Sequence, residues 1–123
     1  MAKKILVVED DAAVQQVLKS SLEKEGYAVE TASDGVEGLE MVRKAMPDLV
    51  LLDIMMPKKD GITVLREMKA DDKIRDIPVI ILTNLTAGDK VAEAMQLDTF
   101  DYLVKAYYSL EDVTRKVKEH LEK

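Results

Sequence analysis

The sequence contains no cysteine at any of its 123 positions. This absence excludes a disulfide framework, a zinc–thiolate site and a cysteine nucleophile. Long hydrophobic runs are missing too: the first apolar stretch, residues 5–8, is too short for a signal-peptide core and far too short to span a bilayer. No linker rich in Pro, Gly or Ser and no internal repeat interrupts the chain. We therefore expect one domain over residues 1–123, located in the cytoplasm.

An excess of positive charge is also missing. The chain carries 24 acidic and 18 basic residues, which gives a formal net charge of −6. Direct binding to nucleic acid or to an anionic membrane needs a basic surface, so this balance disfavours both. The basic residues are scattered or interleaved with acidic ones, as on a solvated surface. Any control of transcription is therefore expected to act through a protein partner.

Apolar residues make up 47% of the chain, and much of this content lies in short runs. Residues 5–8, 49–52 and 79–82 are continuous apolar stretches of strand length. Strands buried on both faces have this pattern, as in a parallel sheet covered by helices. Residues 27–31 alternate apolar and polar side chains, which is typical of an edge strand, and residues 100–104 form a fifth, amphipathic candidate.

Stretches with helical spacing alternate with these strands. They cover residues 14–22, 35–45, 61–70, 87–96 and 110–122, and the first ends at Gly26. Two pairs resemble capping boxes at helix starts, Asp34 with Glu37 and Ser109 with Asp112. Thr86 with Asp89 is expected to open the helix over 87–96. Five strands and five helices in strict alternation predict an α/β fold. We expect a doubly wound, five-stranded parallel sheet of flavodoxin-like order 2-1-3-4-5 in a three-layer α/β/α sandwich.

Ligands of such sheets bind at the carboxyl ends of the strands, at the switch point between strands 1 and 3. Four of the predicted strands end in polar groups. The first strand ends in Glu9, Asp10 and Asp11, the third in Asp53, the fourth at Thr83 and the fifth at Lys105. Each of these residues taken alone could have a purely structural role, such as a helix cap, a turn or a solvated side chain. We assign Asp11 as a helix N-cap. Their joint placement at one edge of the sheet favours a functional site.

Clustered carboxylates repel one another, and one would take up a proton unless a cation is present. Mg²⁺ prefers oxygen ligands and typically takes one or two carboxylates, waters and a phosphate oxygen. A carboxylate beside Mg²⁺ can attack phosphorus and form an aspartyl phosphate, and we assign this role to Asp53. The Lys105 ammonium and the Thr83 hydroxyl would then interact with the phosphate oxygens.

The sequence resembles the receiver domain of bacterial two-component response regulators over essentially its whole length. The resemblance rests on residues 4–11, 53–61, 79–83 and 102–105. It implies that Asp10 binds Mg²⁺ directly and Glu9 through water, that Asp53 is the phosphoacceptor, and that the backbone carbonyl of Met55 completes the metal site. The phosphoryl donor is expected to be a sensor histidine kinase or a histidine phosphotransfer protein.

The resemblance also implies a switch. The Thr83 hydroxyl moves toward the phosphate, Lys105 pairs with it, and Tyr102 is the switch aromatic. The surface of the fourth helix, fifth strand and fifth helix then engages a downstream protein target. On this reading the chain is a signalling domain that assists only its own phosphorylation and dephosphorylation. It departs from the family's pattern at Asn84, where Ala is usual, and at Ala106, where a cis proline is common.

Three alternatives compete with this interpretation. A haloacid-dehalogenase-type phosphatase needs a second Asp two residues after its nucleophile, and Met55 stands there. A flavodoxin needs a phosphate loop rich in Ser, Thr and Gly after the first strand, where this chain has three acidic residues. A degenerate receiver, acting as a constitutive docking module without phosphorylation, is the remaining alternative. The sequence leaves open whether the receiver is free-standing or part of a longer chain.

Overall fold

The computed structural model describes residues 2–54, 56, 58–83, 101–104 and 109–122, with the backbone alone at 83 and 101–104. The strands are β1 (Lys4–Val8), β2 (Ala28–Ala32), β3 (Leu49–Asp53), β4 (Val79–Thr83) and β5 (Asp101–Val104). The described helices are α1 (Ala12–Lys24), α2 (Gly35–Ala45), α3 (Gly61–Ala70) and α5 (Leu110–Leu121). The helix expected over 87–96 lies outside the described residues.

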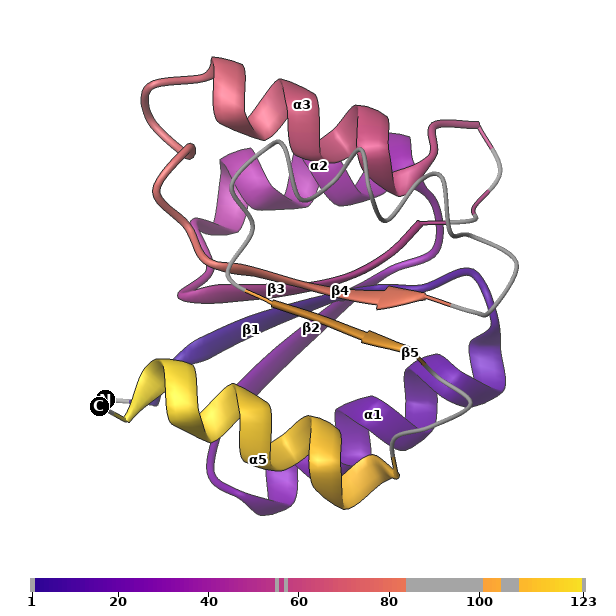
Figure 1. The fold of residues 1–123 in the computed structure, drawn as a ribbon, viewed down its shortest axis with the longest axis vertical. Coiled ribbons are helices and arrows are strands. Elements are labelled where there is room, and N and C mark those ends of the chain that lie inside the picture. Colours follow the sequence, from indigo (N-terminus) through magenta and orange to yellow (C-terminus); the bar gives the residue numbers. More distant parts are fainter. Residues whose placement is uncertain (1, 55, 57, 84–100, 105–108, 123) are drawn as a thin grey trace.

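All neighbouring strands pair in parallel, in the order β2-β1-β3-β4-β5. This order confirms the predicted sheet topology, with β2 as one edge strand and β5 as the other. Helices α2 and α3 cover one face of the sheet, and α1 and α5 cover the other (Figure 1). The fold is therefore a three-layer α/β/α arrangement in which every described crossover brings the chain back to a parallel strand.

The sheet separates two hydrophobic cores, and its central strands supply both. In β1, Leu6 and Val8 belong to the core beneath α2 and α3, whereas Ile5 and Val7 belong to the core beneath α1 and α5. Successive residues of a strand point to opposite faces, so a strand covered on both sides must be apolar throughout. This explains the continuous apolar runs and confirms their interpretation as buried strands.

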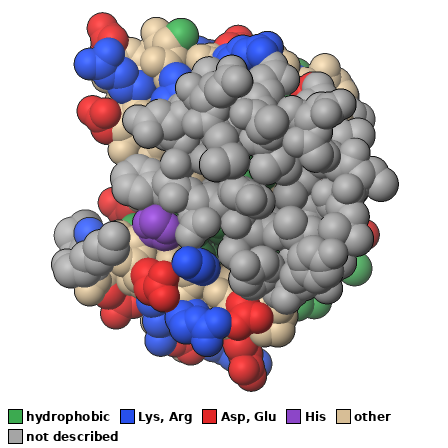
Figure 2. Space-filling view, in the orientation of Figure 1, with side chains coloured by type: hydrophobic (Ala, Val, Ile, Leu, Met, Phe, Trp, Pro, Cys, Tyr) green, Lys and Arg blue, Asp and Glu red, His purple; other side chains and the backbone are tan. Residues whose placement is uncertain are grey.

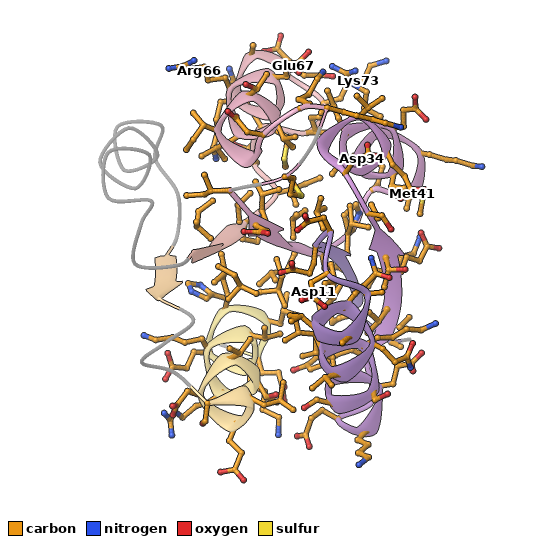
Figure 3. All side chains as sticks on the ribbon, turned by 90° about the vertical axis from the view of Figure 1, so that its right-hand side faces the viewer. Asp11, Asp34, Met41, Arg66, Glu67 and Lys73 are labelled. Carbon is orange, nitrogen blue, oxygen red and sulfur yellow. The ribbon has the colours of Figure 1, made fainter. Side chains whose placement is uncertain are left out.

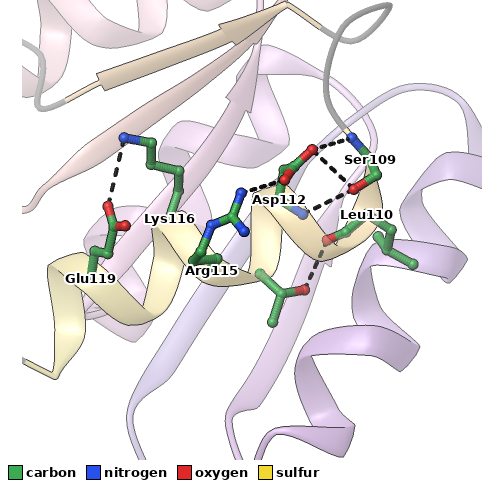
Figure 4. Close-up of polar contacts among 7 residues, drawn as sticks. Ser109, Leu110, Asp112, Arg115, Lys116 and Glu119 are labelled. Carbon is green, nitrogen blue, oxygen red and sulfur yellow. Dashed lines mark hydrogen bonds and ion pairs between the residues drawn. The ribbon is translucent and has the colours of Figure 1, made fainter.

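Side-chain caps define the helix starts, with one difference from the prediction. At α5 the Ser109 hydroxyl accepts from the Asp112 N–H and the Asp112 carboxylate accepts from the Ser109 N–H, which is the predicted capping box (Figure 4). At α2, Asp34 accepts from the Glu37 N–H, but the Glu37 carboxylate accepts from the Ser33 N–H. The reciprocal box predicted at Asp34 is therefore wrong, because Glu37 reaches one residue further back.

The surface of the α5 side carries charges of both signs. Figure 2 shows acidic and basic side chains interleaved along the lower part of this view, over α5. Arg115 pairs with Asp112, and Lys116 pairs with Glu119 (Figure 4). Such exposed pairs contribute little to stability and keep the face hydrated. Among the described residues, no helix combines the length and apolar character that crossing a membrane requires.

Candidate functional site

Three carboxylates meet where β1 and β3 end. Glu9 and Asp10 follow β1, Asp53 is the last residue of β3, and the two strands pair directly, with Val8 opposite Leu52. One carboxylate oxygen from each of the three acids lies within 4.8 Å of the others. Figure 3 views the molecule from this edge of the sheet, with Asp11 on the α1 side and Asp34 on the α2 side. The edge predicted from the strand order is thus where the acids are found.

Burial makes this cluster electrostatically unusual. Glu9 is 1% exposed and Asp53 is 4% exposed, whereas Asp10 lies at the surface. Withdrawing carboxylates from water while they face one another is costly unless positive charge or hydrogen bonds compensate. All three side chains offer hard oxygen atoms, the type of ligand that Mg²⁺ prefers. The donor set and its partial exposure therefore fit a hydrated divalent cation.

The backbone around Glu9 holds the acidic loop in place. The Glu9 N–H donates to the Ala32 carbonyl at the end of β2, with the two atoms 3.0 Å apart. The Asp11 N–H donates to Oε1 of Glu9 at 3.2 Å. Asp11 also caps α1, since its Oδ1 accepts from the Ala13 N–H at 2.9 Å and from the Val14 N–H at 3.2 Å. The predicted N-cap role of Asp11 is confirmed.

The segment after Asp53 packs tightly against the start of α2. A Cβ placed on Gly35 would lie 1.8 Å from the backbone oxygen of Lys59, so only glycine allows this approach. Lys58 adopts a φ of 67° and its Nζ lies 3.5 Å from Oδ2 of Asp34. The hydrogen bond from the Glu37 N–H, together with the Lys58 ammonium, holds the pKa of Asp34 below its usual value. The contact between Lys58 and Asp34 joins segments distant along the chain, so no local sequence pattern indicates it.

Several predicted site residues are described only in part. Thr83 is the last residue of β4 and pairs with Val104 of β5, and Tyr102 pairs with Ile81, but these statements concern the backbone alone. Met55 and Lys105 lie outside the described residues, as do Asn84 and Ala106. Their predicted roles, and the geometry of the bond between residues 105 and 106, stay predictions.

Gln15 contacts the acidic loop and was not singled out by the sequence analysis. Its side-chain amide nitrogen lies 3.0 Å from the Glu9 carbonyl oxygen and 3.1 Å from that of Ala32. A polar residue in the first turns of an amphipathic helix is ordinarily a solvated one, so the sequence offers no local signal for this role. Only the folded chain brings the amide to the end of β2.

Comparisons with known proteins agree with this geometry. Residues 5–118 match the family described as response regulator receiver domain. The response regulator MprA of Mycobacterium leprae is 41% identical over 118 residues, which cover 94% of this chain and 49% of that protein. The chain thus spans about half the length of the curated relatives it matches.

Solved structures share the fold over nearly the full chain. A response regulator receiver domain protein of Clostridium thermocellum is 34% identical, with a TM-score of 0.87 over 98% of this chain and 94% of that one. The chemotaxis response regulator CheY4 of Vibrio cholerae is 28% identical, with a TM-score of 0.88 over 98% and 99%. Domains of this family are phosphorylation-controlled signalling domains of two-component systems and are generally not enzymes. The chain belongs to the response regulator receiver domain family.

Proposed function

We propose that residues 1–123 work as one receiver domain in which Asp53 accepts a phosphoryl group in a Mg²⁺-dependent reaction. The observation that carries this proposal is the acidic cluster, with carboxylate oxygens of Glu9, Asp10 and Asp53 within 4.8 Å of one another. A buried acid at the carboxyl end of a central strand, beside two further acids, is placed where doubly wound folds bind ligands. A purely structural role for three mutually repelling acids has no comparable rationale.

The metal would be held by Asp10 directly, by Glu9 through water, and by Asp53 and the Met55 carbonyl oxygen. Mg²⁺, when bound, supplies positive charge that offsets the carboxylate repulsion and draws a phosphate oxygen toward Asp53. Asp53 is 4% exposed, so its carboxylate has little contact with bulk water. This favours attack on a docked donor and slows hydrolysis of the product.

In the proposed transfer, a carboxylate oxygen of Asp53 forms a bond to phosphorus as the bond from phosphorus to the donor breaks. With a phosphohistidine donor, the imidazole nitrogen leaves with the bonding electron pair, so no proton has to move in the transfer itself. The donor class is a sensor histidine kinase or a histidine phosphotransfer protein. Positioning and charge stabilisation supply most of the catalysis in such transfers.

The proposed output uses Thr83 and Lys105 as partners of the new phosphate and Tyr102 as the aromatic that follows them. Moving a two-state equilibrium from mostly inactive to mostly active takes roughly 5 kcal/mol of differential binding. A few charge-assisted hydrogen bonds supply much of this. The surface of residues 87–96, β5 and α5 then engages a downstream protein. The resemblance supports this part, together with the placement of Thr83 at the end of β4.

The test is incubation of the chain with Mg²⁺ and acetyl phosphate, followed by intact-mass measurement. We expect wild type to gain one phosphoryl mass in Mg²⁺ and none in EDTA. Asp53→Asn should gain none, whereas Asp72→Asn, which alters an exposed acid after α3, should behave as wild type. A wild type that gains no mass, in conditions where an established receiver is labelled, would favour constitutive docking without phosphorylation.

A further inference from the structure

The side-chain amide of Gln15 bridges the loop after β1 and the end of β2, beside the backbone hydrogen bond from the Glu9 N–H to the Ala32 carbonyl. Its Nε2 donates to the Glu9 carbonyl at 3.0 Å and to the Ala32 carbonyl at 3.1 Å, and the Ser33 hydroxyl oxygen lies 3.4 Å away. Glu9 begins the loop after β1, and Ala32 ends β2. One amide with two N–H groups therefore serves two carbonyls that belong to different segments.

Together with two other hydrogen bonds, the contact with Gln15 restrains both the backbone and the side chain of Glu9. The Glu9 N–H donates to Ala32, the Glu9 carbonyl accepts from Gln15, and Oε1 of its carboxylate accepts from the Asp11 N–H. Both backbone polar groups of a residue that is 1% exposed are thus satisfied, and the peptide plane between Glu9 and Asp10 is restrained. The orientation of that plane sets where both acidic side chains leave the backbone.

We propose that Gln15 is a positioning residue that holds the Glu9–Asp10 peptide in the orientation that Mg²⁺ binding requires. The inference rests on the proposed use of Mg²⁺ by the acidic cluster. Gln15 is not a ligand in this proposal, since its amide nitrogen is a donor and is directed at carbonyl oxygens. Groups that orient metal ligands typically change metal affinity by tenfold or more when they are removed.

The first measurement is a calorimetric titration of the phosphate-free chain with Mg²⁺ alone, on wild type, Gln15→Met and Gln16→Met. Methionine keeps the length and approximate volume of glutamine but removes the donor. We expect Gln15→Met to weaken Mg²⁺ binding by roughly tenfold. Gln16→Met is the matched control, because the Gln16 amide contacts Ser20 on the exposed face of the same helix. It should bind Mg²⁺ as wild type does.

The second measurement separates positioning from general stabilisation. Labelling by acetyl phosphate should be slower in Gln15→Met at a Mg²⁺ concentration near the wild-type Kd and should recover at saturating Mg²⁺. Amide hydrogen exchange should rise at Glu9 and Asp11, with little change in the β4 and α3 amides. If Gln15→Met does not fold, Gln15→Asn keeps the amide on a stem one methylene shorter and is expected to shift the Mg²⁺ affinity in the same direction.

The outcomes are distinct for the two proposals. If wild type binds Mg²⁺ and is labelled on Asp53 while Gln15→Met binds with the same Kd, the positioning role is overturned and the proposed function stands. The same conclusion follows if Gln15→Met loses stability toward urea with an unchanged Kd. If wild type itself binds no Mg²⁺ and gains no phosphoryl mass, the proposed function fails and the role of Gln15 fails with it.

Discussion

Among the described residues, the charged side chains that the fold buries are Glu9 and Asp53, and both lie at one edge of the sheet. Each takes part in polar interactions, and Asp10 stands beside them at the surface. Burial of charge is expensive, so buried acids are found mainly where a ligand or a reaction makes use of them. At the scale of single residues, this is the feature that separates the candidate site from the other acids of a chain with net negative charge.

A residue near this site carries backbone strain. Lys58 has a φ of 67°, a region that residues other than glycine enter at a cost of roughly 1–2 kcal/mol. We expect Lys58→Gly to raise the free energy of unfolding in urea by about 0.5–1 kcal/mol, after the greater entropy of glycine in the unfolded chain is subtracted. Loss of the ion pair with Asp34 reduces this gain in stability only slightly, because the Lys58 side chain is 69% exposed.

The matched control is Lys59→Gly at the next position, whose φ is not positive. It should lower stability, because flexibility is added and the pair with Glu67 is removed without relief of strain. Equal losses in both variants would show that the Lys58 conformation is not strained.

Residue types alone predicted the acids of the site, because their spacing relative to apolar runs places them after strands. The contacts of Gln15 and Lys58 were not predictable in this way. Their partners lie at least six residues away along the chain, and for the Ala32 and Asp34 contacts 17 and 24 residues away. Polar side chains on helix surfaces and in loops have many possible partners, and only the packed elements select among them.

At the scale of elements, close approaches between helix starts and loops hold Asp53 in register. The Gly61 N–H donates to the Ile54 carbonyl at 2.8 Å, which brings the first turn of α3 against the end of β3. A Cβ on Gly61 would lie 2.3 Å from the Asp53 carbonyl oxygen and 2.8 Å from the Ile54 Cα. These neighbours are backbone atoms, so a side chain at this position must displace either the strand end or the helix.

We expect Gly61→Ala to lower the free energy of unfolding by roughly 1–3 kcal/mol, the usual cost of overpacking. It should also slow labelling of Asp53 by acetyl phosphate, because the strand end that carries the acceptor shifts. Urea denaturation and intact-mass time courses measure the two effects. Gly38→Ala is the control, since the three atoms nearest to its Cβ would be side-chain atoms of Val8 and not backbone atoms. It should change labelling little. Unaltered labelling in Gly61→Ala would contradict the coupling.

The sequence predicted where helices and strands begin and end wherever neighbouring residues, such as caps, determine the boundary. The predicted helices 35–45 and 61–70 coincide with α2 and α3, and the Ser109–Asp112 capping box is present as predicted. The third and fourth strands end at Asp53 and Thr83, as predicted, one residue beyond the apolar runs. A polar residue ends an apolar run in the sequence, but pairing with a neighbouring strand continues the ladder through it, as Asp53 opposite Leu82 shows.

At the scale of the whole molecule, the sheet carries a core on each face and gathers the strand ends at one edge. Repulsion among the three acids at that edge lowers the stability of the folded chain when no cation is bound. A cation that binds only the folded chain therefore stabilises the entire domain by mass action. The increment is about 2.7 kcal/mol when free Mg²⁺ is 100 times its Kd.

We accordingly expect Mg²⁺ to shift the urea midpoint of wild type upward, in proportion to the logarithm of its concentration above Kd. NaCl at matched ionic strength should shift it much less, because screening alone does not supply ligand bonds. Asp10→Asn, which removes one carboxylate from the cluster, should respond weakly to Mg²⁺. A rise of equal size in NaCl, or in Asp10→Asn, would show that no specific cation site is present.

By itself, the sequence determined the class of the fold, the strand order, the family, and which acids end the central strands. It did so because apolar periodicity, caps and strand-end residues are local properties that the sheet topology then combines. The tertiary structure alone decided that Glu9 and Asp53 are buried. It also brings one carboxylate oxygen each from Glu9, Asp10 and Asp53 within 4.8 Å of one another. It also decided that the Gln15 amide contacts both the loop after β1 and the end of β2. Burial and distance depend on packing between segments far apart in the chain, and no local pattern encodes them.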